Sequence, residues 1–331
     1  MRLADKVLEG DVQAAAQLIT GIEDEMPSAL EELEVLYPHT GKAYVIGITG
    51  PPGIGKSTLI DKVISIFRQR NMTVGVVAVD PTSPFTGGAL LGDRIRMQQR
   101  AFDPGVFIRS LATRGWLGGL AKATMGAINV IDAMGKDIIL IETVGTGQSE
   151  SEIIRVADTT IVVLSAETGD EIQIMKAGIM EVADIFVINK ADKGGAENKQ
   201  VEIELMLNMK TLFQSEWRPS IVLTEAISGK GVERVVDEVY KHREFLTRNS
   251  GLERCRQERA KQELVTEIES IVRKYFHEEI EKGGYLEKLI NDFVNRKEGP
   301  RSAASKIIEQ FSKQFKSITN NGQLKNSVKR E

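Results

Sequence analysis

The segment Gly50–Ser57 constrains the fold of this chain more than any other, because it matches the pattern G-x-x-x-x-G-K-[ST]. An apolar run, Tyr44–Thr49, comes before it, and a helical pattern, Lys56–Arg70, follows it. In such a strand–loop–helix unit the glycines let backbone N–H groups approach phosphate oxygens, and the helix N-terminus adds the positive end of its dipole. Lys56 is expected to reach the β- and γ-phosphates of a nucleotide, and Ser57 to bind Mg²⁺. The predicted phosphate-binding residues are Gly50, Pro51, Pro52, Gly53, Ile54, Gly55, Lys56, Ser57 and Thr58.

Short apolar runs alternate with amphipathic helical patterns from Ala43 to about Arg248. Near-continuous apolar runs are typical of parallel strands that helices cover on both faces. The predicted strands are Tyr44–Thr49, Thr73–Val79, Val106–Arg109, Ile138–Ile141, Thr160–Leu164, Ile185–Ile188 and Ile221–Thr224. The predicted helices between them are Lys56–Arg70, Leu117–Met134, Asp170–Val182 and Glu197–Phe213. We therefore expect an α/β fold of the P-loop NTPase kind, a doubly wound, mostly parallel sheet that binds its ligand at the carboxyl ends of the strands.

Helical regions flank this α/β pattern on both sides. Residues 1–42 are expected to form an N-terminal helical extension, with a second short helix over Ser28–Leu36 that Ser28 caps. Residues 43–250 are expected to form the P-loop domain, and residues 251–331 a C-terminal helical region without strands. From the residues alone, the C-terminal helices can either pack on the core or extend as an arm to a second subunit.

The composition excludes several other classes of protein. With 41% hydrophobic and 27% charged residues in 331, the chain has the balance of a globular protein and not of a disordered one. The longest apolar runs are too short to cross a bilayer, and the charged N-terminus disfavours a secretory signal. Cys255 is the single cysteine, so we expect no internal disulfide and a cytoplasmic location. The net charge of −4 gives no basic footprint, so neither a nucleic acid nor a membrane is an expected partner.

A second motif, N-K-x-D at Asn189–Asp192, follows the apolar run Ile185–Ile188. A carboxylate only accepts hydrogen bonds, and guanine offers N1–H and the 2-amino group side by side, whereas adenine does not. Asp192 is therefore expected to select GTP, because its carboxylate would have no hydrogen-bond donor to pair with if ATP were bound. Asn189 is expected to order the loop, and Lys190 to pack its stem on the face of the base.

Two carboxylates follow predicted strands at places suited to a metal, and a third lies between them in the chain. Asp80 comes directly after the second predicted strand, Glu142 directly after the fourth, and Asp93 lies in a glycine-rich segment between. Mg²⁺ prefers hard oxygen ligands, usually one or two carboxylates together with phosphates and water. We expect Ser57, Asp80, Asp93 and Glu142 to surround the Mg²⁺ of a GTP complex.

The segment after Glu142 carries the expected contact to the γ-phosphate, the backbone N–H of Gly145. Ordinary GTPases have Asp-x-x-Gly here, whereas this chain has Glu142-x-x-Gly145. Thr146, and not glutamine, follows Gly145, and Gln148 comes two residues later. Because the usual water-positioning glutamine is absent, we expect slow hydrolysis unless a partner assists.

Several long motifs together carry a resemblance to a known family. They are the phosphate-binding loop, Asp80–Pro84, Gly87–Met97, Arg109–Leu120, Glu142–Glu150 and Asn189–Asp192. Over roughly residues 40–250 the chain closely resembles the MeaB/ArgK-type GTPases, the chaperones associated with methylmalonyl-CoA mutase. The resemblance implies a GTPase that gates the loading of adenosylcobalamin into a cobalamin-dependent acyl-CoA mutase and protects that mutase. It also implies a homodimer held by the C-terminal helices.

The resemblance extends to two further segments. Gly169–Lys176 resembles the third switch of the family, in which residues matching Asp170 and Lys176 respond to the mutase and support GTP hydrolysis. A lysine brought to the γ-phosphate stabilises developing negative charge. Near the last strand the family often has Thr-Ser-Ala, whereas this chain has Thr224-Glu225-Ala226. The Ala226 backbone N–H is expected to face guanine O6, and the role of Glu225 stays open.

Two alternative functions are weighed against this one. A metal-delivery GTPase shares Glu-x-x-Gly but needs thiolate or imidazole ligands. This chain offers one cysteine and three separated histidines, His39, His242 and His277. A kinase linked to amino-acid transport is the other alternative, and Asp192 speaks against ATP as its phosphate donor.

Overall fold

The computed structural model describes residues 2–80, 100, 102–112, 119–143, 156–165, 183–210, 217–282, 293–297, 299–302, 304–306 and 308–309. The chain divides into two compact units, Met1–Lys261 and Gln262–Glu331. The first unit contains the sheet and every described residue of the predicted site. The domain boundaries predicted at residues 42 and 250 stay predictions. No helix among the described residues has the length and apolar character needed to cross a bilayer.

A seven-stranded sheet with the order β3-β2-β4-β1-β5-β6-β7 forms the centre of the first unit, and every pairing in it is parallel. The strands are β1 (Tyr44–Thr49), β2 (Val74–Asp80), β3 (Val106–Ala112), β4 (Ile138–Glu142), β5 (Thr159–Ser165), β6 (Ile185–Asn189) and β7 (Ser220–Leu223). All seven predicted strands are confirmed, and β3 differs most from its prediction, since it continues to Ala112. From β1 the chain crosses to β2 on one side, while β5, β6 and β7 lie on the other. The carboxyl end of β1 is therefore at the switch point where such sheets bind ligands.

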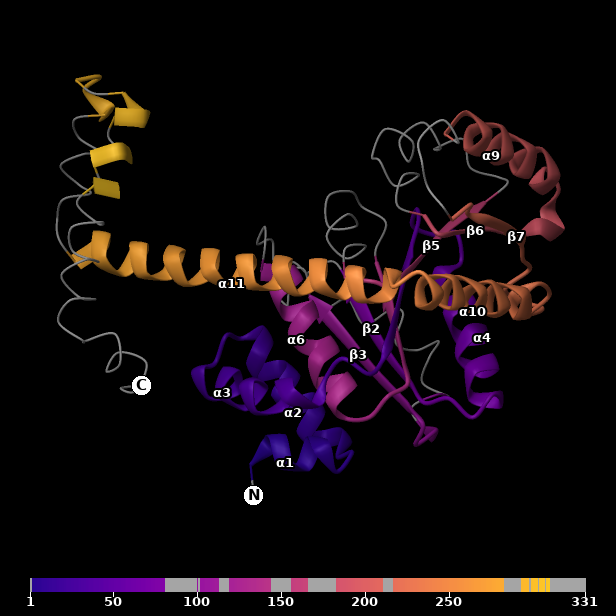
Figure 1. The fold of residues 1–331 in the computed structure, drawn as a ribbon, viewed down its shortest axis with the longest axis horizontal. Coiled ribbons are helices and arrows are strands. Elements are labelled where there is room, and N and C mark those ends of the chain that lie inside the picture. The colour runs from indigo at the N-terminus through magenta and orange to yellow at the C-terminus, as the bar shows by residue number, and fades with distance from the viewer. Residues whose placement is uncertain are drawn as a thin grey trace. The chain divides into compact units, whose positions relative to one another are not determined.

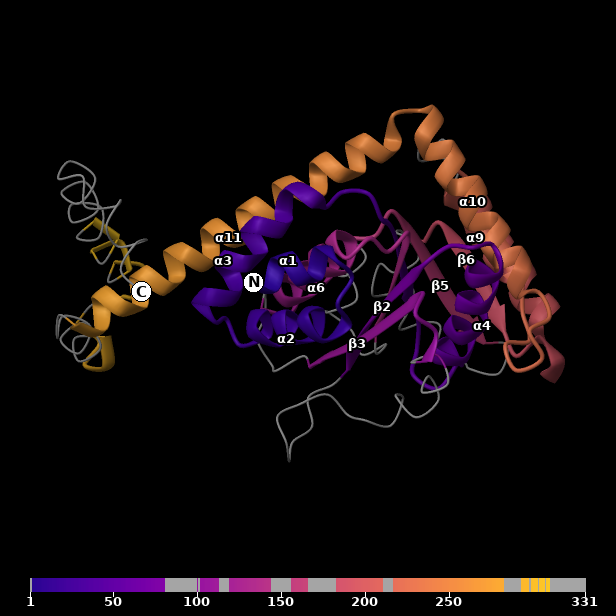
Figure 2. The ribbon, with the colours of Figure 1, turned by 90° about the horizontal axis from the view of Figure 1, so that it is seen from below.

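Helices cover both faces of the sheet, as the strand pattern predicts (Figures 1 and 2). On one face, α4 (Lys56–Gln69) and α10 (Val232–Arg248) share a core with side chains such as Ile46, Ile48 and Val163. On the other face, α6 (Gly119–Ala133) and α9 (Ala196–Lys210) pack on side chains that alternate with these, such as Val45 and Val162. The predicted helix Asp170–Val182 lies outside the described residues.

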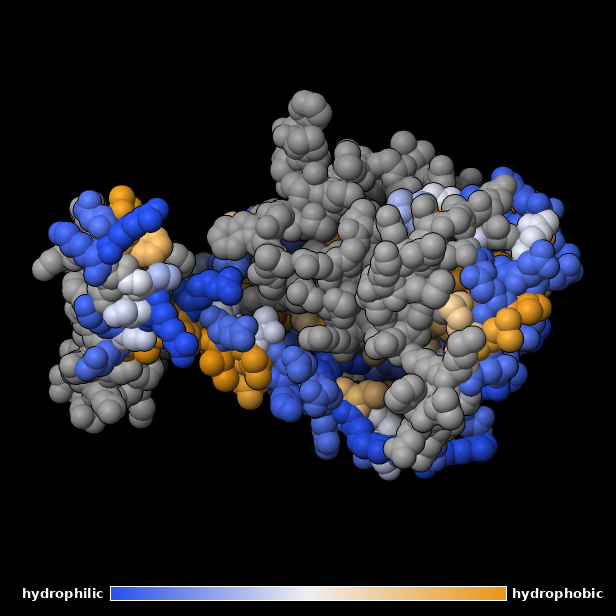
Figure 3. Space-filling model, turned by 90° about the horizontal axis from the view of Figure 1, so that it is seen from above, coloured by the Kyte–Doolittle hydropathy of each residue, from blue (hydrophilic) through white to orange (hydrophobic). Residues whose placement is uncertain are grey.

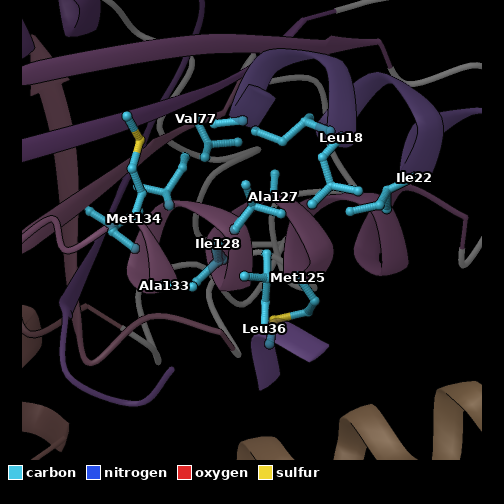
Figure 4. Packing of buried hydrophobic residues seen from close by; sticks show 14 of the residues in the cluster. Leu18, Ile22, Leu36, Val77, Met125, Ala127, Ile128, Ala133 and Met134 are labelled. Carbon is cyan, nitrogen blue, oxygen red and sulfur yellow. The ribbon is translucent and has the colours of Figure 1, made fainter. Parts of the chain in front are cut away.

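Three N-terminal helices pack on α6. They are α1 (Leu3–Leu8), α2 (Val12–Glu23) and α3 (Pro27–Leu36), followed by a short 3₁₀ turn, Tyr37–His39. Leu18 and Ile22 of α2 belong to the same buried cluster as Ala127 of α6 (Figure 4). A Cβ atom at Gly126 of α6 would come 2.7 Å from Ile22 Cγ2, so a glycine there allows α2 to approach closely. The predicted helical extension is thus part of the same compact unit as the sheet.

The predicted cap of α3 is wrong. Met26, and not Ser28, is the N-cap residue, and no side chain caps this helix. Pro27 begins the helix because its fixed φ suits the first turn and its missing N–H would have had no helical partner there. Ser28 therefore lies inside the first turn.

The last described helix of the first unit, α10, is followed by α11 (Gly251–Lys282), whose residues fall in both units. Two arginines in its first turns contact the amino end of the sheet. Arg259 lies 2.5 Å from the fully buried Asp158 carboxylate, which also accepts the backbone N–H of Val45. Arg256 donates to the Gly41 carbonyl oxygen at 2.6 Å. These contacts fix the start of α11 at the edge of the sheet opposite the P-loop.

A pair of ionisable side chains, the buried His242 and the half-buried Asp184, lies at the same amino end. The Nδ1 atom of His242 is 2.9 Å from Thr159 Oγ1, and its Nε2 atom is 3.4 Å from Asp184 Oδ1. Burial lowers the pKa of His242 to about 4 and raises the pKa of Asp184 to about 7. The Thr160 backbone N–H donates to the Asp184 carboxylate and partly offsets that rise.

Asp184→Asn is expected to make the free energy of unfolding fall as the pH drops from about 6.5 to about 4. In the native chain, the pair holds one proton in either state between these pH values. In the unfolded chain the proton is on His242, and in the folded chain it is on Asp184. The numbers of bound protons are therefore equal, and the pair contributes little to the pH dependence of stability. The variant leaves only His242, which is neutral when folded and protonated when unfolded, and the loss reaches about 3 kcal/mol. Urea unfolding across this pH range measures it, and the reciprocal variant His242→Gln is expected to lose stability as the pH rises instead. Parallel pH profiles for the native chain and both variants would contradict this account.

Candidate nucleotide site

The loop between β1 and α4 has a backbone that favours glycine at three positions. Gly50, Gly53 and Gly55 have φ angles of 140°, 78° and 96°, in the region that L side chains rarely adopt. A Cβ atom at Gly50 would lie 2.1 Å from the Val163 carbonyl oxygen, and one at Gly55 would lie 2.5 Å from Asn189 Nδ2. The loop is therefore pressed against β5 and against the end of β6. This close packing gives the physical reason for Gly50 and Gly55, the two glycines that the motif specifies.

Lys56 begins α4 with its side chain buried across this loop. Its Nζ atom donates to the carbonyl oxygens of Gly50 at 2.7 Å and Pro51 at 2.9 Å, and the residue is 7% exposed. A buried ammonium group needs such partners. The amine is held at the rim of the loop, where backbone N–H groups and the α4 N-terminus favour an anion.

Ser57 and Glu142 meet at the carboxyl ends of neighbouring strands. Ser57 Oγ donates to Glu142 Oε1 at 2.7 Å, and Glu142 is 7% exposed. The register of β1 on β4 pairs Ile48 with Glu142, which fixes the carboxylate beside the loop. Next to it, Thr143 Oγ1 donates to Thr49 Oγ1 at 2.9 Å, a buried contact that the sequence motifs do not predict.

This oxygen pair fits Mg²⁺, which prefers few carboxylates and fills its shell with phosphate and water. Asp80 is the last residue of β2, the strand next to β4. Because Ala78 of β2 is paired with Glu142 of β4, the backbone of Asp80 lies at the same carboxyl end of the sheet as Glu142. Asp93 lies outside the described residues. Within the described part of the chain, no group of three or more His, Cys, Asp and Glu side chains is placed to hold a metal ion.

Asn189 joins three loops at the end of β6. Its Nδ2 atom donates to the Ile54 carbonyl oxygen at 2.8 Å, and its Oδ1 atom accepts from Thr224 Oγ1 at 3.1 Å and from the Ala226 backbone N–H at 3.0 Å. The side chain is buried, with 2% exposure. One amide thereby fixes the phosphate-binding loop, the loop after β6 and the loop after β7 relative to each other. The motif predicts an ordering role for Asn189 but not these partners.

The backbone turns sharply after Asn189. Lys190 has a φ angle of 59°, an uncommon value for a residue with a side chain, and such backbone strain is concentrated at functional sites. The Ala191 N–H then donates to the Thr224 carbonyl oxygen at 3.1 Å. Asp192 follows in a short 3₁₀ turn, Ala191–Lys193, and is exposed. Its carboxylate lies on the surface of the loop that Asn189 ties to Ile54.

The structure brings together most of the predicted site residues that it describes. The phosphate-binding loop, Ser57 with Glu142, and Asn189 with Ala226 are in direct contact, and Lys190 and Asp192 follow Asn189. Gly145, Asp170 and Lys176 lie outside the described residues, as Asp93 does. Two of the three histidines considered as metal ligands are described. His242 is buried at the end of the sheet opposite the phosphate-binding loop, and His39 is exposed.

Comparison with known proteins places this site in a family. The family model described as methylmalonyl Co-A mutase-associated GTPase MeaB matches residues 15–281. A protein of Pyrococcus abyssi named as a GTPase is 49% identical over 93% of this chain and 96% of its own length. The GTPase ArgK of Escherichia coli is 30% identical over 94% of this chain and 96% of its own length.

A solved structure gives the same result for the fold. The crystal structure of an LAO/AO transport system kinase covers 94% of this chain and 96% of its own, with a TM-score of 0.69 at 24% sequence identity. That identity supports the shared fold alone. The family match, the two GTPase relatives and the P-loop fold agree with the resemblance that the motifs predict, and the chain belongs to the MeaB family of GTPases.

Proposed function

We propose that this protein binds GTP with Mg²⁺, hydrolyses it to GDP and phosphate, and uses this cycle to gate adenosylcobalamin loading and protection of a cobalamin-dependent acyl-CoA mutase. The observation that supports the nucleotide part best is Asn189, which holds the phosphate-binding loop and the loops around Asp192 and Ala226 in one arrangement. The description of its family supports a methylmalonyl-CoA mutase as the client.

In the proposed reaction one set of residues binds the phosphates of GTP and another set binds the guanine base. Bound Mg²⁺ would neutralise charge on the β- and γ-phosphates, held by Ser57 and by the carboxylates of Asp80, Asp93 and Glu142. Lys56 stabilises charge that develops on the γ-phosphate, and the Gly145 N–H contacts that group. At the other end Asp192 accepts hydrogen bonds from guanine, and the Ala226 N–H, which donates to Asn189 Oδ1 in the structure, is proposed to turn toward guanine O6.

The C-terminal helices are proposed to hold a homodimer. On α11 the side chains of Leu264, Ile268 and Ile271 are 62%, 51% and 58% exposed. Elsewhere most of the described surface in Figure 3 is hydrophilic, with only small hydrophobic patches. Apolar side chains repeated at helical spacing on a surface are typical of helix–helix contacts. This face supports a dimer, and the sedimentation velocity of the purified protein tests it.

The proposed chaperone role is tested by single-turnover GTP hydrolysis with and without a purified methylmalonyl-CoA mutase. Because Thr146, and not glutamine, immediately follows Gly145, we expect slow hydrolysis alone and at least a tenfold acceleration by the mutase. Lys176→Ala is expected to keep the slow rate and lose the acceleration. The transfer of adenosylcobalamin to the mutase, followed by absorbance, is expected to depend on the bound nucleotide. Fast hydrolysis by the isolated protein, or equal transfer with GTP and GDP, would contradict the proposal.

A further inference from the structure

The loop after β7 is a small closed turn beside the proposed guanine site. The Glu225 N–H donates to the Lys230 carbonyl oxygen at 3.0 Å, and the Gly229 N–H donates to the Glu225 carbonyl oxygen at 2.8 Å. Gly231 then leaves the turn with a φ angle of 80°, and a Cβ atom there would lie 2.1 Å from the Leu223 carbonyl oxygen. The turn is therefore anchored on the end of β7, and it presents Ala226 to Asn189.

The side chain of Glu225 closes this turn a second time. Its Oε1 atom lies 2.7 Å from Lys230 Nζ, and its Oε2 atom accepts from Ser228 Oγ at 3.1 Å. The Glu225 side chain is 23% exposed, whereas that of Lys230 is 78% exposed. Lys230 lowers the pKa of the Glu225 carboxyl, and Glu225 raises the pKa of Lys230. The two groups thus favour each other's charged form, although water surrounds the lysine.

The turn also lies beside the loop that carries a second carboxylate, since the Ala191 N–H donates to the Thr224 carbonyl oxygen at 3.1 Å, one residue before Glu225. After Glu225, Asp192 is the other charged side chain that raises the pKa of Lys230. Asp192 is exposed, and no described residue is hydrogen-bonded to its carboxylate. An ammonium on a flexible stem can move between two neighbouring carboxylates, and it will prefer the one with the better geometry.

We infer that Glu225 is a positioning residue for guanine recognition, which holds the Lys230 ammonium on the loop and so keeps the Asp192 carboxylate available to the base. This inference rests on the proposed binding of guanine nucleotides at Asp192. Without the Glu225 charge, Lys230 would pair with Asp192, and guanine would have to displace it. Lys230 and Glu225 are therefore expected to work as a pair.

The test is a double-mutant cycle on GDP affinity, measured by isothermal titration calorimetry with Mg²⁺. Glu225→Gln keeps the size of the side chain but removes its charge, and it is expected to weaken GDP binding about fivefold, the scale of an exposed ion pair. Lys230→Met is expected to bind GDP within about twofold of the native chain. The double variant is expected to recover native affinity, because the competing ammonium is gone.

The salt dependence of GDP affinity is a second measurement, and it would not change if the role of Glu225 were purely structural. Competition between Lys230 and guanine is electrostatic, so the defect of Glu225→Gln is expected to shrink between about 0.05 M and about 0.5 M NaCl. A double variant as weak as Glu225→Gln, or a defect that salt leaves unchanged, would overturn the inference. So would Glu225→Gln with native affinity. If the native chain itself binds no GDP, the proposed function fails instead, and the two failures are thereby distinguished.

Discussion

Asp192→Asn is expected to weaken GDP and GTP binding by about a thousandfold and to create binding of xanthosine nucleotides. The native carboxylate only accepts hydrogen bonds, which suits the N1–H and 2-amino donors of guanine. An asparagine amide keeps one acceptor but presents an N–H₂ group to the 2-amino group, so two donors face each other. Xanthine carries an oxygen at that position, which accepts from the amide.

Calorimetric titrations of the native chain and the variant with GDP and xanthosine diphosphate measure this exchange. Because Asp192 is exposed, the variant is expected to fold as the native chain does. Asp24→Asn, an equal change of charge at the exposed end of α2, is the matched control and is expected to bind GDP normally. A variant that keeps its GDP affinity would show that another residue selects the base.

Lys56→Ala is expected to lower the single-turnover rate of GTP hydrolysis by a factor of about a hundred or more. The amine lies over the phosphate-binding loop, bonded to the carbonyl oxygens of Gly50 and Pro51, at the place where charge on the γ-phosphate would develop. Alanine removes that positive charge and leaves bound Mg²⁺, the backbone N–H groups of the loop and the α4 N-terminus to attract the phosphates.

The control for this prediction is Lys62→Ala, which removes a lysine from the middle of the same helix. Since Lys56 is buried, the thermal unfolding of both variants must be measured beside their rates. A Lys56→Ala variant that folds and hydrolyses GTP within about threefold of the native rate would show that Lys56 has no catalytic role.

The sheet and the phosphate-binding loop could be predicted from the sequence because their signals are local. Each apolar run forms a strand close to the predicted bounds, with the largest difference at β3, because a strand buried on both faces needs apolar residues throughout. Gly50 and Gly55 are specified by the backbone of their own loop and its packing on Val163 and Asn189. The cap of α3 was missed because two local rules compete there, and the proline at Pro27 decides where the helix begins.

The remaining contacts join residues far apart in the chain, and no local pattern predicts them. Asn189 contacts Ile54 across 135 positions, and His242 contacts Thr159 across 83. Each depends on the order of strands and on the depth at which a helix packs. The role of Glu225 was open for the same reason, since its partner Lys230 carries no motif and is identified only by the closure of the turn.

We expect this chain to bind guanine nucleotides selectively, with the phosphates on the loop between β1 and α4 and the base at Asp192 in the turn after β6. The most direct measurement is calorimetric titration of the native protein with GDP and with ADP at equal concentrations, each with Mg²⁺. We predict saturable binding of one GDP per chain and an affinity for ADP at least a hundredfold weaker, because adenine lacks the N1–H and the 2-amino group that donate to Asp192. Equal affinity for the two nucleotides, or no binding of GDP, would contradict it.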